Sequence, residues 1–138
     1  MDSKKSTGKK VLCIEDEHFI SELYGRALRR AGYDVTIMLS GEDGLRAAQS
    51  NEYDVILLDL MIPGITGFEV LRRLNKESPK IKAKIIITTN LEQEYDSRSE
   101  IEKMADGYLI KAEFTPRQLV EMINDIAEGK VPKESYLT

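Results

Sequence analysis

Short apolar runs alternate with longer amphipathic segments along most of the chain. Residues 11–14 and 55–58 are continuous apolar runs, which are typical of strands that are covered on both faces. Apolar residues occupy every second position in residues 35–39, and this indicates a strand with one less buried face, as at a sheet edge. Residues 84–89 and 107–111 complete a set of five predicted strands.

The segments between these runs show the spacing of helices. After the first run, apolar residues recur at intervals of three and four, and Gly32 stands where such a helix would end. The residues of this predicted apolar face are Ile20, Leu23, Tyr24, Ala27, Leu28 and Ala31. Residues 40–50, 68–74 and 119–127 also predict helices, and residues 93–105 show a weaker helical pattern.

Strands that alternate with helices predict an α/β fold, a doubly wound parallel sheet with helices on both of its faces. We expect one domain at residues 10–129, after a disordered lead-in at residues 1–9 and before a tail at residues 130–138. The pattern by itself leaves the strand order open. Ligands of open parallel sheets bind beyond the carboxyl ends of the strands, so polar residues at these ends are the candidates for function.

Composition narrows the classes of function. A net charge of −4 argues against nucleic acid as the main partner, and no apolar run approaches the roughly 20 residues of a membrane span. The first ten residues, MDSKKSTGKK, lack the apolar core of a secretory signal. Cys13 and His18 are the sole cysteine and histidine, which excludes an internal disulfide and a zinc site built from several cysteines. These features predict a cytoplasmic protein.

Charged and hydroxyl side chains gather where four of the predicted strands end. They are Glu15, Asp16, Asp59, Thr88, Thr89 and Lys111. Each alone is more often a turn, cap or ordinary strand residue, and it is their joint occurrence that indicates a site. Three carboxylates on one rim repel each other, and Mg2+ with its oxygen ligands would remove that conflict. A carboxylate can also attack phosphorus and become an aspartyl phosphate.

Four segments resemble the receiver domain of two-component response regulators: VLCIEDE, DVILLDLMIPGITG, IIITTN and DGYLIK, which occur in the family's order and spacing. The resemblance covers residues 10–129 and implies a flavodoxin-like (βα)5 sheet with strand order 2-1-3-4-5. It implies that Asp59 is the phospho-acceptor. It also implies that Asp16 and Asp59 bind Mg2+ directly, Glu15 through water, and Met61 through its backbone carbonyl.

The resemblance assigns roles to three further residues near the phospho-acceptor. Thr89 matches the hydroxyl residue that contacts the phosphoryl group, and Lys111 matches the lysine that pairs with it. Tyr108 matches the aromatic switch residue, although it is also explained as a packed strand aromatic. Thr88 is then an ordinary strand residue.

Two positions depart from the family pattern. Ala112 follows Lys111. Receivers usually have a proline at this position, and the peptide bond between the lysine and that proline is cis. A cis bond before a residue other than proline costs roughly 2.5–4 kcal/mol, so we predict a trans bond and a shifted loop. Asn90 replaces the small residue that usually follows the hydroxyl residue, and its bulk is expected to change the lifetime of the phosphoryl group.

The resemblance implies a single-domain response regulator in a phosphorelay, which catalyses only its own phosphorylation and dephosphorylation. A histidine kinase or phosphotransfer protein would donate the phosphoryl group. A downstream protein or a second copy of the chain would bind the face formed by the fourth helix, fifth strand and fifth helix, and no output domain is expected.

Three other classes of protein compete with this interpretation. A receiver-like module that is independent of phosphate is the first, and the complete set of acidic, hydroxyl and lysine residues argues against it. A phosphatase with an aspartate nucleophile would have a second Asp at position 61, where this chain has methionine. A flavodoxin-type cofactor binder would not have the acidic EDEH sequence after its first strand.

Overall fold

The computed structural model describes residues 6–90 and 95–130, and for residues 95–97 the backbone alone. Five strands alternate with five helices, as predicted. The elements are β1 (Lys10–Ile14), α1 (His18–Arg30), β2 (Asp34–Met38), α2 (Gly41–Gln49), β3 (Val55–Asp59), α3 (Gly67–Leu74), β4 (Lys84–Thr89), α4 (Tyr95–Met104), β5 (Gly107–Ile110), the 3-10 turn η1 (Lys111–Glu113) and α5 (Pro116–Ala127). Most of the predicted lead-in, residues 1–5, and of the predicted tail, residues 131–138, lies outside the described residues.

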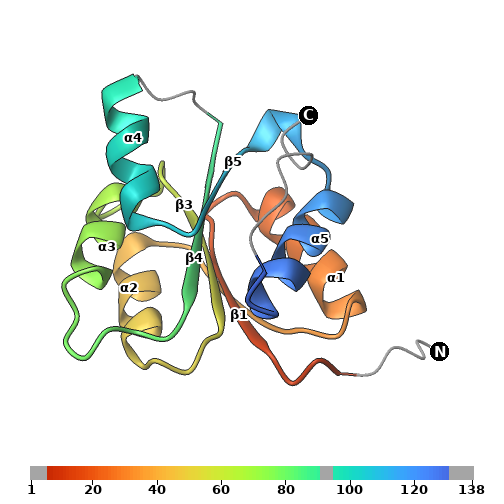
Figure 1. The fold of residues 1–138 in the computed structure, drawn as a ribbon. Helices are drawn as coiled ribbons and strands as arrows, with labels where there is room; N and C mark the ends of the chain where they lie inside the picture. The colour runs from red at the N-terminus through yellow and green to blue at the C-terminus, as the bar shows by residue number, and fades with distance from the viewer. Residues whose placement is uncertain (1–5, 91–94, 131–138) are drawn as a thin grey trace.

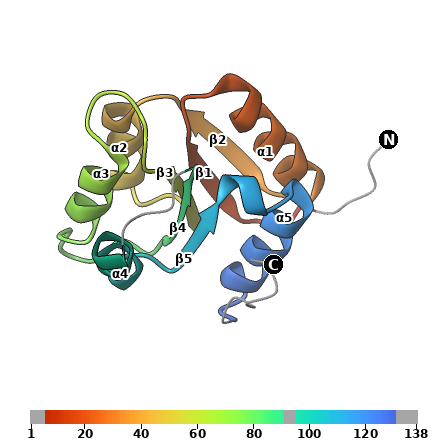
Figure 2. The ribbon, with the colours of Figure 1, turned by 90° about the horizontal axis from the view of Figure 1, so that it is seen from above.

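The strands form one parallel sheet in the order β2-β1-β3-β4-β5, which confirms the predicted fold class and strand order. Figure 1 shows α2, α3 and α4 on one face of this sheet and α1 and α5 on the other. Figure 2, seen from above, shows β2 at one edge and β5 at the opposite edge. The edge position predicted for β2 is confirmed, and its cover is incomplete, since Val35 is buried whereas Thr36, Ile37 and Met38 are only partly covered.

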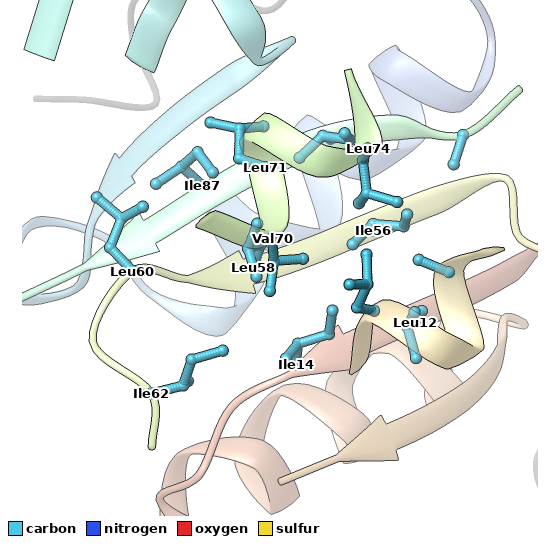
Figure 3. Packing of buried hydrophobic residues seen from close by; sticks show 14 of the residues in the cluster. Leu12, Ile14, Ile56, Leu58, Leu60, Ile62, Val70, Leu71, Leu74 and Ile87 are labelled. Atoms are coloured by element: carbon cyan, nitrogen blue, oxygen red, sulfur yellow. The ribbon is translucent and has the colours of Figure 1, made fainter. Parts of the chain in front are cut away.

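The two continuous apolar strands supply a core to each face of the sheet. Successive side chains of a strand point to opposite faces, so Leu12, Ile14, Ile56 and Leu58 pack under α2, α3 and α4, as Figure 3 shows for the labelled residues. The residues between them pack under α1 and α5; they are Val11, Cys13, Val55 and Leu57. Full coverage on both faces is the reason that these runs contain no polar residue before the strand ends.

The helix boundaries follow local signals. The side-chain oxygens of Ser40 and Thr66 accept hydrogen bonds from the backbone N–H groups of Asp43 and Glu69 at the starts of α2 and α3. Thr115 and Gln118 form a reciprocal capping box at the start of α5.

One helical prediction was partly wrong. The buried residues of α1 are Ser21, Tyr24, Gly25 and Leu28, whereas Leu23 of the predicted apolar face is 37% exposed. The small residues Ser21 and Gly25 turn toward the sheet, and a Cβ at Gly25 would lie 3.4 Å from Ile37 Cδ1. Close packing of α1 on the sheet therefore decides which stripe is buried.

The chain leaves β3 in a tight path that brings α3 against the strand end. The backbone N–H of Gly67 donates to the carbonyl of Leu60 at 3.1 Å, and a Cβ at Gly67 would lie 2.1 Å from the Asp59 carbonyl oxygen. Only glycine allows this close approach. Among the described residues, no helix has both the length and the apolar character needed to cross a bilayer.

Candidate functional site

Asp59 is the last residue of β3 and is 3% exposed at the carboxyl edge of the sheet. Its carboxylate has a partner on each oxygen. Oδ1 accepts a hydrogen bond from the backbone N–H of Met61 at 3.0 Å, and Lys111 Nζ donates to Oδ2 at 3.0 Å. The carboxylate is therefore held in a fixed orientation by groups from the loop after β3 and the turn after β5.

Lys111 also pairs with Glu15, so one ammonium group serves two buried carboxylates. The Lys111 side chain is 5% exposed, and that of Glu15 is 1% exposed. Burial lowers the pKa of Lys111, but its hydrogen bonds with Glu15 and Asp59 outweigh burial and leave that pKa raised. The ammonium group is thus firmly charged at neutral pH and neutralises part of the negative charge of the site.

The pKa of Glu15 is raised to about 7. Burial is the largest cause because it disfavours the charged form. The hydrogen bond from Lys111 opposes this effect, and the negative charge of Asp59 adds to it. Burial also raises the pKa of the neighbouring thiol Cys13 to about 12, with a further contribution from Glu15, so the thiol stays neutral and serves as a core residue.

The carboxylates of Glu15, Asp16 and Asp59 converge at the site. Each offers a ligand atom, and these atoms all lie within 4.8 Å of one another. Three acidic groups at this separation suit a hard cation with oxygen ligands, so the residues present fit Mg2+. Met61 follows two residues after Asp59, and its amide is bonded to the Asp59 carboxylate, so its peptide lies beside the cluster.

Thr89 and Tyr108 come from neighbouring strands on the same face of the sheet. In the β4–β5 register Thr89 pairs with Ile110, and Ile87 pairs with Tyr108. Because side chains alternate along a strand, Thr89 and Tyr108 both point to the side that α4 covers. Thr89 is completely buried and Tyr108 is 6% exposed, whereas Thr88 points to the opposite face.

Arg98 of α4 is a contact of Tyr108 that the sequence did not reveal. Its guanidinium carbon lies 4.6 Å from the centroid of the Tyr108 ring, and its Nε donates to Glu102 at 2.7 Å. The spacing of four residues between Arg98 and Glu102 predicts a helical ion pair. Nothing in the sequence places this pair over the aromatic ring of the next strand.

The two departures from the family pattern lie at the edge of the site. The described chain has its cis peptide bond at Ser78–Pro79, so the Lys111–Ala112 bond is trans, as predicted. Lys111, the first residue of the 3-10 turn η1, nevertheless reaches Asp59 Oδ2 at 3.0 Å. Asn90 is exposed and follows Thr89 directly, and its effect on the lifetime of a phosphoryl group stays a prediction.

Known proteins share both the sequence and the fold. The family model of the response regulator receiver domain matches residues 11–124. The alkaline phosphatase synthesis transcriptional regulatory protein PhoP of Bacillus subtilis is 36% identical, with 89% of this chain and 57% of that protein covered. The response regulator ArlR of Staphylococcus saprophyticus is 39% identical, with 74% of this chain and 45% of that protein covered. The chain thus spans about half the length of these relatives.

Solved structures agree with this match. The chemotaxis response regulator CheY4 of Vibrio cholerae superposes with a TM-score of 0.75 at 30% identity, covering 86% of this chain and 98% of that one. The receiver domain of the Francisella response regulator 1452 superposes with a TM-score of 0.79 at 28% identity, covering 88% and 98%. The chain therefore belongs to the family of response regulator receiver domains of two-component systems.

Proposed function

We propose that this receiver accepts a phosphoryl group on Asp59 and that the reaction requires Mg2+. The observation that supports this most directly is the arrangement around Asp59. A buried carboxylate is held by Lys111 at 3.0 Å, and two further carboxylates lie within reach of a shared cation. Acids that serve only as caps or turn residues have no reason to cluster in this way. Each carboxylate added to the cluster repels the others, and a bound cation would offset this repulsion.

In the proposed reaction a carboxylate oxygen of Asp59 attacks the phosphorus of a phosphohistidine on the donor protein. The new O–P bond forms as the P–N bond breaks, and the imidazole of the donor leaves with the electron pair. Lys111 donates to the phosphoryl oxygens, and the hydroxyl of Thr89 contacts them. Asp16, Asp59 and the Met61 carbonyl would hold Mg2+ directly and Glu15 would hold it through water, and the bound ion would neutralise negative charge at the acceptor.

We propose that phosphorylation shifts a two-state equilibrium of the face built from α4, β5 and α5. Thr89 and Tyr108 are the switch residues, and their position on one face of the sheet supports a coupled movement. The partners proposed for this face are a downstream protein or a second copy of the chain. The net charge of −4 favours a protein over nucleic acid for this segment.

A phosphorylation assay with a small donor tests the assignment in the absence of any kinase. The protein is incubated with acetyl phosphate and Mg2+, and its intact mass is measured. We expect the mass of one added phosphoryl group in the wild type and in Asp43→Asn, a control that changes an exposed acid of α2, and none in Asp59→Asn. A mass gain that persists in Asp59→Asn contradicts the assignment of the acceptor.

A second measurement separates the switch from a phosphate-independent module. Beryllofluoride with Mg2+ mimics the phosphoryl group, and the NMR chemical shifts of backbone amides report its effect. We expect shifts at Thr89, Tyr108 and Lys111 in the wild type and none in Asp59→Asn. An unchanged spectrum of the wild type in saturating Mg2+ and beryllofluoride supports the inert module instead.

A further inference from the structure

The loop between β3 and α3, residues 60–66, carries Met61 past the cluster of carboxylates. Its first part is fixed by the hydrogen bond from the Met61 amide to Asp59. Its later part is held by the start of α2, a separate element. The backbone N–H of Gly41 donates to the Pro63 carbonyl at 3.2 Å, and the backbone N–H of Ile65 donates to Glu42 Oε2 at 3.1 Å.

The start of α2 packs closely on this loop. Gly64 has a φ of +82°, and a Cβ added there would lie 1.9 Å from Glu42 Oε1. A Cβ added at Gly41 would lie 2.0 Å from the Ile65 carbonyl oxygen. The Glu42 carboxylate thus packs directly on the loop backbone, on the residues that follow Met61.

An acidic residue in the first turn of a helix has a simpler explanation, because the helix dipole favours it. Asp43 fits that explanation, since its carboxylate pairs with Arg46 of the same helix at 2.9 Å. Glu42 differs, because its carboxylate accepts a hydrogen bond from the backbone N–H of Ile65, 23 residues away. A bond between a carboxylate and an N–H is also stronger than one between neutral groups.

We propose that Glu42 is a positioning residue for the Mg2+ site, which it serves by fixing the loop that presents Met61. This inference rests on the proposed function, because it assumes that Mg2+ binds at the carboxylate cluster. A backbone ligand has no side-chain rotamer to adjust, so its position depends on the hydrogen bonds of its loop. Groups that orient metal ligands in this way typically change metal affinity by about 10–100-fold when they are removed.

Three variants separate positioning from charge. Glu42→Ala removes the acceptor, Glu42→Gln keeps an oxygen that accepts from Ile65, and Asp43→Ala removes the same charge from the same helical turn. Mg2+ affinity is measured by titration of amide shifts at Met61 and Asp59. We expect Glu42→Ala to weaken Mg2+ binding about tenfold, and Glu42→Gln and Asp43→Ala to bind Mg2+ like the wild type.

A metal-free measurement reads the loop directly. In EDTA, amide hydrogen exchange of Ile65 is expected to be faster in Glu42→Ala than in the wild type and unchanged in Asp43→Ala. Thermal unfolding in EDTA checks that each variant is folded at the temperature of the titration. We expect all of them to be folded, because the side chains of Glu42 and Asp43 are exposed.

The outcomes distinguish this inference from the function on which it rests. Wild-type affinity in Glu42→Ala overturns the role of Glu42 and leaves the Mg2+ site intact. Equal losses in all three variants also overturn it, because the effect is then one of charge. A wild-type protein that binds no Mg2+ overturns the metal site, and the role of Glu42 with it.

Discussion

At the scale of single residues, the electrostatics of the site depend on the burial of Glu15 and Asp59, two acids that share the ammonium group of Lys111. Glu15 is almost completely buried and its pKa is raised to about 7, first by burial and then by Asp59, against the hydrogen bond from Lys111. The sequence indicated that these acids would meet. It could not give the burial of each one, which depends on how the loops after β1 and β3 close over the strand ends.

Glu15 gives the metal-free protein a defined pH dependence. Between pH 4.5, the ordinary pKa, and about 7, the folded state retains a proton that the unfolded state has released. The free energy of unfolding therefore falls as pH rises through this window, by on the order of 3 kcal/mol from Glu15. Urea unfolding in EDTA at several pH values is expected to show this slope in the wild type and a flatter one in Glu15→Gln. Parallel pH profiles contradict the raised pKa.

Asn90 is the residue for which we expect an effect on the lifetime of the phosphoryl group. It is exposed and directly follows the buried Thr89, and we expect its side chain to border the route of a hydrolytic water to Asp59. We expect Asn90→Ala to lose the phosphoryl group several-fold faster than the wild type, as followed by phosphate release after removal of the donor. Equal rates in the two proteins dismiss the idea.

At the scale of elements, α4 and β5 are joined by a contact between a cation and an aromatic ring. Arg98 lies over Tyr108 and is paired with Glu102. The predicted helix at residues 93–105 contains both charged residues, but helical spacing gives no information on what a helix packs against. Residues 91–94, where part of that prediction falls, lie outside the described residues.

The contribution of Arg98 to stability can be divided by two substitutions. Arg98→Ala removes the ring contact and the ion pair, and we expect a loss of about 1 kcal/mol in the free energy of unfolding. Glu102→Gln removes the ion pair alone, and the expected loss is about 0.3 kcal/mol, since the pair is partly exposed. Urea unfolding measures both. Equal losses in the two variants mean that the contact with Tyr108 contributes nothing.

At the scale of the whole molecule, the parallel sheet brings together residues that are nearly a hundred positions apart. Glu15 and Lys111 come from strands that are separated by β3 and β4 in the sheet, and they meet because both leave the carboxyl edge. Asp59, at the end of β3, pairs with the same lysine, so the site exists only in the folded chain. Binding of a cation there must stabilise the whole fold.

Mg2+ is accordingly expected to raise the unfolding temperature of the protein. At a free concentration of ten times Kd, the gain in the free energy of unfolding is about 1.4 kcal/mol for a single site. Thermal unfolding with Mg2+ and with EDTA should differ in the wild type and agree in Asp16→Asn, which lacks one of the proposed ligands. A shift of the same size in Asp16→Asn would place the bound Mg2+ elsewhere on the protein.

The sequence by itself determined the elements and the fold class, because burial on both faces of a parallel sheet imposes continuous apolar strands and amphipathic helices. It also determined the residue types at the strand ends, and the resemblance supplied their roles and the strand order. Tertiary structure alone decided which stripe of α1 is buried, how Lys111 divides between Glu15 and Asp59, and what Glu42 and Arg98 contact. These features depend on packing between distant segments, and periodicity along the chain reports only on each segment's own exposed and buried faces.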